Sequence, residues 1–125
     1  MLAINIPEVV AEVAQHFARY EQALVDNDVA TLNDIFWRSP HTLRYGISEN
    51  LYGHAEISSY RAARPAHGLA RTVGRTVITT FGRDFATASI DFVRGGRDGR
   101  QMQTWARIDG GWHVVAAHVS YMEPA

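Results

Sequence analysis

The segment that decides the fold reads Asp109-Gly110-Gly111-Trp112-His113-Val114-Val115-Ala116-Ala117-His118-Val119-Ser120. Its Asp-Gly-Gly start is typical of a turn, and the β-branched and aromatic residues that follow predict a strand. Even-numbered residues from Trp112 would point to one side and odd-numbered residues from Val115 to the other, which makes both faces apolar. Both faces of the sheet should therefore be covered. Because the helices of one chain can cover only one face, we expect a homodimer through the outer face.

The strands that precede this segment have the pattern of a meander. Stretches rich in β-branched and aromatic residues are separated by turn-forming Gly and Asp residues, so neighbouring strands should pair as antiparallel hairpins. The expected strands cover residues 72–81, 85–93, 101–108 and 112–121.

The N-terminal part of the chain has the period of helices. Apolar residues recur every three or four positions from Pro7 to about Asp26, and Pro7 suits a first helical position. Asn27 and Asp28 end this helix and cap a second one, which Ser39-Pro40 terminates. The sequence therefore predicts a helical hairpin at the start of the domain.

A short strand over residues 41–47 and a third helix over 53–64 complete the expected elements. The helices precede the strands, and no linker or repeat divides the chain. We therefore expect one α+β domain over 1–125, with the helical hairpin and the third short helix packed on a curved antiparallel sheet. A pocket for a small molecule should lie between the helices and the sheet.

Composition excludes several functional classes. The chain has 125 residues, a formal net charge of −1 and a pI near 6.6, values that disfavour nucleic acid as a partner. It has no Lys for a Schiff base and no Cys for thiol chemistry or a disulfide. Neither a membrane span nor a signal peptide is indicated, so we expect a cytoplasmic protein. The six scattered His and the absence of a phosphate-binding glycine loop predict neither a metal nor another cofactor.

Two polar residues occupy positions where the pattern of the sequence favours an apolar side chain. Tyr20 lies on the apolar stripe of the first helix, where it is either a core tyrosine bonded to a backbone carbonyl or a functional phenol. Arg44 lies between Leu43 and Tyr45 in the short strand. It is either on a solvated edge or a buried clamp for an anion.

Further candidates lie on the third helix and the last two strands. Arg61 and Arg64 share a face with Tyr60, so at least one guanidinium turns toward the pocket unless both extend to solvent. His118 and Ser120 continue the side of Trp112, and His118 is either a core residue or a reserve acid or base. On the strand before, Gln101, Gln103 and Trp105 alternate with Met102, Thr104 and Ala106, and Gln103 would donate from its amide into the cavity unless a bulge reverses the strand.

Several segments together resemble a known family. The closing strand after the helical hairpin resembles that of the SnoaL-like superfamily, which includes nuclear transport factor two and ketosteroid isomerase. The chain is most similar to the AtzH-like proteins, which are also described as HpxZ-type oxalurate catabolism proteins. The matching segments are Thr42–Gly46, Glu49–Gly53, Ile57–Arg64 and Gln103–Trp105, with the closing strand.

The resemblance implies a cone-shaped, cystatin-like fold and a bacterial catabolic enzyme. The reaction implied is a decarboxylating amidohydrolysis of carboxylated ureides, of the dicarboxyurea or oxalurate-pathway type. The tyrosine and arginine proposed for the family fall on Tyr20 and Arg44, and Tyr60 stands where the family tends to have Phe.

The sequence-based hypothesis is an enzyme in which Arg44 holds the substrate carboxylate with help from Arg61 or Arg64. Tyr20 would be the proton donor or base, and His118 the reserve. The substrate-binding set would be Arg61, Arg64, Tyr60, Gln103, Trp105 and Ser120. Two alternatives remain: a ligand-binding or dimeric scaffold protein, and a lyase or isomerase that acts on a hydrophobic ring, as in polyketide-cyclase relatives.

Overall fold

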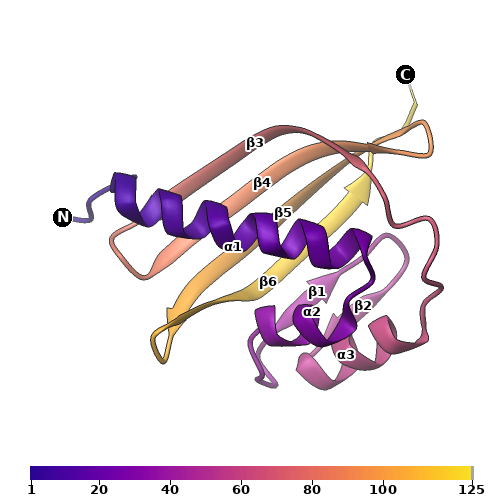
Figure 1. Ribbon diagram of the computed structural model, residues 1–125, viewed down its shortest axis with the longest axis horizontal. Coiled ribbons are helices and arrows are strands. Elements are labelled where there is room, and N and C mark those ends of the chain that lie inside the picture. The colour runs from indigo at the N-terminus through magenta and orange to yellow at the C-terminus, as the bar shows by residue number, and fades with distance from the viewer. Residues whose placement is uncertain (125) are drawn as a thin grey trace.

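The computed structural model describes residues 1–124 and shows three helices against one sheet (Figure 1). The helices are α1 (Pro7–Val25), α2 (Val29–Ile35) and α3 (His54–Ala63). The strands are β1 (Leu43–Tyr45), β2 (Asn50–Tyr52), β3 (Thr72–Phe81), β4 (Phe85–Arg94), β5 (Arg97–Ile108) and β6 (Gly111–Tyr121). The predicted α+β architecture is confirmed. Within the described part of the chain, no helix is both long and apolar enough to cross a membrane.

The helical hairpin forms for the predicted reasons. Pro7 occupies the first turn of α1, where its missing N–H would have no helical partner. Asn27 turns the chain with a φ of 51°, and the side chain of Asp28 accepts a hydrogen bond from the backbone N–H of Thr31 at 3.1 Å. This cap starts α2 directly after α1, so the two helices pack on the same side of the sheet.

The sheet is mixed rather than wholly antiparallel. Among residues 1–124 the strand order is β2-β1-β6-β5-β4-β3, and the four long strands pair as antiparallel hairpins. β1 pairs in parallel with β6, with Arg44 opposite Ala117, and the connection between these two strands runs through β2, α3 and the other three long strands. β2 was not predicted, and it pairs antiparallel with β1 across the turn at residues 46–49. Arg44 is the middle residue of β1 and lies at the edge of the layer that the helices form.

A bulge in β6 changes which residues face the core. Thr104 of β5 is opposite Ala116, but the next residue, Trp105, is opposite Val114, so Val115 has no cross-strand partner. After the bulge Ala117 and Val119 are buried, whereas His118 is exposed. The prediction that His118 and Ser120 continue the side of Trp112 is therefore wrong, because the extra residue reverses the alternation.

The helices cover one face of the sheet and leave the other open. In β4, Ala86, Ala88, Ile90 and Phe92 are buried, and the residues that alternate with them are exposed or half-buried. In Figure 1, α1 lies along the face of β3 to β6, and α2 and α3 lie beside β1 and β2. The outer face carries apolar side chains that are each at least 43% exposed, namely Val77, Phe85, Val93 and Met102.

Candidate functional site

A cavity of about 140 Å³ lies between the helices and the inner face of the sheet. α1 contributes Tyr20 and Leu24, β1 and the turn after it contribute Arg44 and Glu49, and α3 and its C-cap contribute Tyr60 and Arg64. The rest of the wall comes from the segment around Leu69 and Arg71 and from β4, β5 and β6. The cavity is smaller than the ~300–1,000 Å³ of pockets for drug-sized ligands, which favours a molecule of few atoms.

The charge of this cavity is strongly positive. Arg44, Arg64, Arg71 and Arg94 line it, and Arg61 lies buried close behind Arg44 and Arg64. Two carboxylates offset them, because Arg44 pairs with Glu49 at 3.0 Å and Arg71 pairs with Glu21. Of these five guanidinium groups, those of Arg61, Arg64 and Arg94 have no carboxylate partner among residues 1–124.

Arg61 and Arg64 are the least compensated of these groups. Arg61 is 2% exposed, and its guanidinium lies 4.1 Å from the ring centroid of Phe36. Its Nε and Nη1 atoms, and the Nε and Nη2 atoms of Arg64, are buried without a hydrogen-bond partner among residues 1–124. Burial lowers the pKa of Arg61 to about 9, and burial followed by the charge of Arg44 lowers the pKa of Arg64. A pKa of about 9 leaves the Arg61 guanidinium cationic at neutral pH.

Arg44 is neither solvated nor free. Its side chain is 13% exposed and donates from Nη1 to Glu49 Oε1, whose own side chain is 17% exposed. The contact depends on Gly46, because a Cβ atom there would lie 1.6 Å from Glu49 Oε1. Although burial raises it, hydrogen bonds from Arg44 and Ser48 hold the pKa of Glu49 below its ordinary range. An internal carboxylate thus occupies the guanidinium that was expected to hold the substrate.

Tyr60 lies beside this ion pair. The guanidinium of Arg44 is 5.6 Å from the centroid of the Tyr60 ring, a cation–π contact. Burial, and then the negative charge of Glu49, raises the pKa of Tyr60. Its hydroxyl is therefore protonated at neutral pH and adds a hydrogen-bond donor to the wall.

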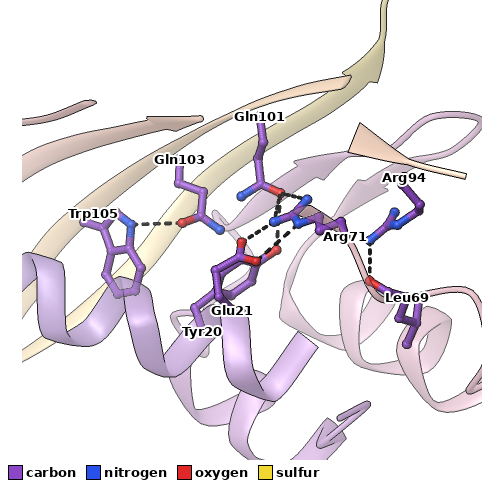
Figure 2. A network of polar contacts seen from close by, with 8 residues as sticks. All are labelled: Tyr20, Glu21, Leu69, Arg71, Arg94, Gln101, Gln103 and Trp105. Atoms are coloured by element: carbon purple, nitrogen blue, oxygen red, sulfur yellow. Dashed lines mark hydrogen bonds and ion pairs between the residues drawn. The ribbon is translucent and has the colours of Figure 1, made fainter. Parts of the chain in front are cut away.

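Tyr20 is the centre of a second network on the opposite wall (Figure 2). It is 3% exposed, and its hydroxyl donates to Gln101 Oε1 at 3.3 Å. Arg71 donates to the same oxygen from Nη1 and Nη2, each at 3.3 Å, while it also pairs with Glu21. The interpretation of Tyr20 as bonded to a backbone carbonyl is wrong, because its partner is a side chain in the cavity wall.

Phe92 holds two of the arginines in place. The guanidinium of Arg71 lies 4.5 Å and that of Arg94 5.6 Å from the centroid of its ring. Arg94 also donates from Nη2 to the backbone oxygen of Leu69 at 2.9 Å, which ties the segment before β3 to β4. The aromatic ring and this tether fix the direction of both positive charges.

Sequence reasoning did not single out five of these residues: Glu21, Glu49, Arg71, Arg94 and Gln101. Two of them could have been predicted from their spacing to a buried residue on the same element. Arg94 follows buried Phe92 by two positions on a strand, and Glu21 follows Phe17 by four positions on the stripe of α1. Arg71 lies just before a strand, where no periodicity applies to it.

The remaining predicted site residues lie elsewhere. Trp105 and Gln103 are buried on the inner face, and the indole Nε1 of Trp105 donates to Gln103 Oε1 at 3.1 Å. His118 packs edge-on against the Tyr45 ring, with 5.6 Å between centroids, and Ser120 Oγ accepts from Arg100 Nε at 3.2 Å. His118 and Ser120 are on the outer face and belong to no wall of the cavity. Among residues 1–124, no three His, Asp or Glu side chains gather as a metal site would require.

The chain is similar to a known protein family and to several solved structures. A family model described as AtzH-like matches residues 2–125. A structure of unknown function from the DUF3225 family of Pectobacterium atrosepticum is 52% identical, covers 96% of this chain and 95% of its own, and has a TM-score of 0.93. A cystatin-like fold protein from Burkholderia xenovorans is 44% identical over 100% of both chains, with a TM-score of 0.94.

More distant structures share the fold alone. A nuclear transport factor 2-like superfamily protein from Salmonella enterica is 24% identical over 94% of each chain, with a TM-score of 0.78. Curated proteins gave no significant match.

Proposed function

Since this chain belongs to the AtzH-like family, we propose that it is a cofactor-free hydrolase of C–N bonds in small carboxylated ureides, of the dicarboxyurea or oxalurate-pathway type. The observation that carries the proposal is the pair of buried guanidiniums, Arg61 and Arg64, whose N–H groups lack a partner within residues 1–124. A buried unpaired cation costs stability, so an anion that binds there recovers that free energy.

Arg64, which lines the cavity, is the primary anchor for the substrate carboxylate in this proposal, and the buried charge of Arg61 behind it adds to the attraction. A guanidinium offers a planar pair of N–H donors that matches both oxygens of a carboxylate. Arg44 is engaged by Glu49 at 3.0 Å, so it assists only where the substrate competes with that carboxylate. This reverses the order of roles expected from the sequence.

Tyr20 is the acid in the proposed reaction. Hydrolysis joins a water oxygen to the ureido carbonyl carbon and breaks its bond to nitrogen, which leaves with a proton. Tyr20 supplies that proton from the cavity wall and regains one from the attacking water. The excess positive charge around the cavity stabilises the oxyanion that forms as water adds.

The test is turnover of oxalurate and of freshly prepared dicarboxyurea. Tyr20→Phe should lower kcat while carboxylate binding persists, and Arg64→Met should raise KM. His118→Ala is the control, because His118 is exposed on the outer face, and it should leave both constants unchanged. Unaltered kinetics in Tyr20→Phe and Arg64→Met would overturn the proposal.

A carrier or sensor of the same anion is the second candidate. It is favoured by the hydrogen bond from the Tyr20 hydroxyl to Gln101, which directs the phenolic proton to the protein rather than to a ligand. Calorimetric binding of oxalurate without turnover would support this candidate. A lyase or isomerase acting on a hydrophobic ring finds no support in a cavity of about 140 Å³ lined by arginines.

We also propose that the protein is a homodimer through the outer face of the sheet. This face exposes Val77, Phe85, Val93 and Met102, and a two-fold axis would set these apolar side chains against their own copies. Light scattering at micromolar concentration should give twice the 13.9 kDa mass of the chain. A monomeric mass would contradict the proposal.

A further inference from the structure

Two glutamine side chains are buried in succession on the inner face of β5. Gln101 is 4% exposed and lines the cavity, whereas Gln103 is 1% exposed and lies next to Gln101 on the strand, outside the cavity lining. They are two positions apart on one strand, so their side chains leave the same face roughly 7 Å apart. Both amides therefore lie under α1 where water has little access.

The orientation of each amide is fixed by a neighbour that can only donate hydrogen bonds. Arg71 donates twice to Gln101 Oε1, and the indole of Trp105 donates to Gln103 Oε1 at 3.1 Å. Neither guanidinium nor indole can accept, so turning either amide over would set its NH₂ against another N–H. Figure 2 shows the result, with the two oxygens directed apart and the two amide nitrogens turned toward each other.

Residues 1–124 provide no acceptor for these nitrogens. Gln101 Nε2 and Gln103 Nε2 are both buried without a hydrogen-bond partner in the part of the chain that the structure describes. The residues across from Gln103 are Ala88 and Ala117, and those across from Gln101 are Ile90 and Val119. None of these cross-strand side chains can accept a hydrogen bond, so the two nitrogens are free to donate to an oxygen from outside the protein.

We propose that the Gln101–Gln103 amide pair is a subsite for a carbonyl oxygen of the ligand. This inference rests on the proposed carboxylate site at Arg61 and Arg64, and it adds a second requirement to the substrate class. The ligand is a carboxylate that carries an uncharged acceptor, such as a ketone, amide or ureido oxygen, beyond its anionic end. Arg71 and Trp105 are positioning residues for this subsite, because each acts by fixing one amide.

Two acids that differ in one oxygen test the proposal. 4-Oxopentanoate and pentanoate share the carboxylate and the chain length, and only the first has a carbonyl. Calorimetry on the full chain should show 4-oxopentanoate binding at least about tenfold more tightly, since pentanoate leaves both amides unsatisfied. Gln103→Met should reduce that ratio to near one by weakening 4-oxopentanoate alone.

Further variants keep the test decisive. Gln103→Glu retains the acceptor for Trp105 but removes the NH₂ group, so it should fold and also bring the ratio near one. Gln22→Met is the control, because Gln22 is exposed and bonds to Asp26 on the outer side of α1, and it should preserve the ratio.

The outcomes separate the two proposals. Equal binding of both acids to the wild-type protein would overturn the subsite and leave the carboxylate site standing, with water between the amides. A ratio that persists in Gln103→Glu would also overturn it. If neither acid binds, the carboxylate site fails and the subsite fails with it.

Discussion

Replacement of Arg61 by Met should stabilise the empty protein. Burial lowers the pKa of Arg61 to about 9, more than three units below the ordinary value of a guanidinium. At about 1.36 kcal/mol for each pKa unit, the charged side chain costs roughly 4 kcal/mol in the folded state. The variant loses the cation–π contact with Phe36, worth about 1–2 kcal/mol. We therefore expect a net gain of about 2 kcal/mol, which is roughly 6–10 °C in Tm for a chain of this size.

The pH dependence gives an independent check of the same reasoning. The folded protein releases the Arg61 proton near pH 9, whereas the unfolded chain keeps it to higher pH. Wild-type stability should therefore rise relative to Arg61→Met above pH 9, and the advantage of the variant should shrink there. Arg38→Met is the control, because Arg38 is exposed and paired to Asp34, and it should change Tm little. A lower Tm for Arg61→Met at pH 7 would refute the reasoning.

Three further substitutions test the walls of the cavity and the helical hairpin. Glu49→Gln frees Arg44 from its internal carboxylate and should tighten malonate binding several-fold by calorimetry; weaker binding would show that Glu49 contacts the ligand favourably. Gly99→Ala places a Cβ atom 2.3 Å from Cζ of Phe92 and should lower the free energy of unfolding by about 1–3 kcal/mol in urea. Unchanged stability would contradict that packing. Asp28→Ala removes the cap of α2 and should cost about 1 kcal/mol, whereas no loss would show that the cap is dispensable.

The elements with strong local signals were predictable. Pro7 and the apolar stripe after it defined α1, and Asp28 marked the start of α2. The hairpin turns predicted β3, β4 and β6 to within one residue at each end, whereas β5 begins at Arg97, four residues before its predicted start at residue 101. Membership of the AtzH-like family, expected from the closing strand and its companion segments, is confirmed. β2 escaped prediction because Asn50–Tyr52 is three residues long and shows no period.

The site was predictable where a polar residue interrupts an apolar pattern or shares a helix face with its neighbours. Tyr20 and Arg44 were found in the first way, Tyr60 and Arg64 in the second, and all four line the cavity. His118 was misplaced because one unpaired residue in β6 reverses the alternation, and a bulge leaves no mark in the pattern of the sequence. The partners of Tyr20 and Arg44, which are Gln101 and Glu49, depend on tertiary contacts that no local rule encodes.

A crystal structure of the protein with malonate or oxalurate tests the central claim most directly. The account predicts one carboxylate bound in the cavity with an oxygen within hydrogen-bond distance of the Arg64 guanidinium, whose Nε and Nη2 atoms have no partner within residues 1–124. A cavity that stays free of the anion at saturating concentration, or an anion bound only on the outer face near Arg100 and His118, would contradict it.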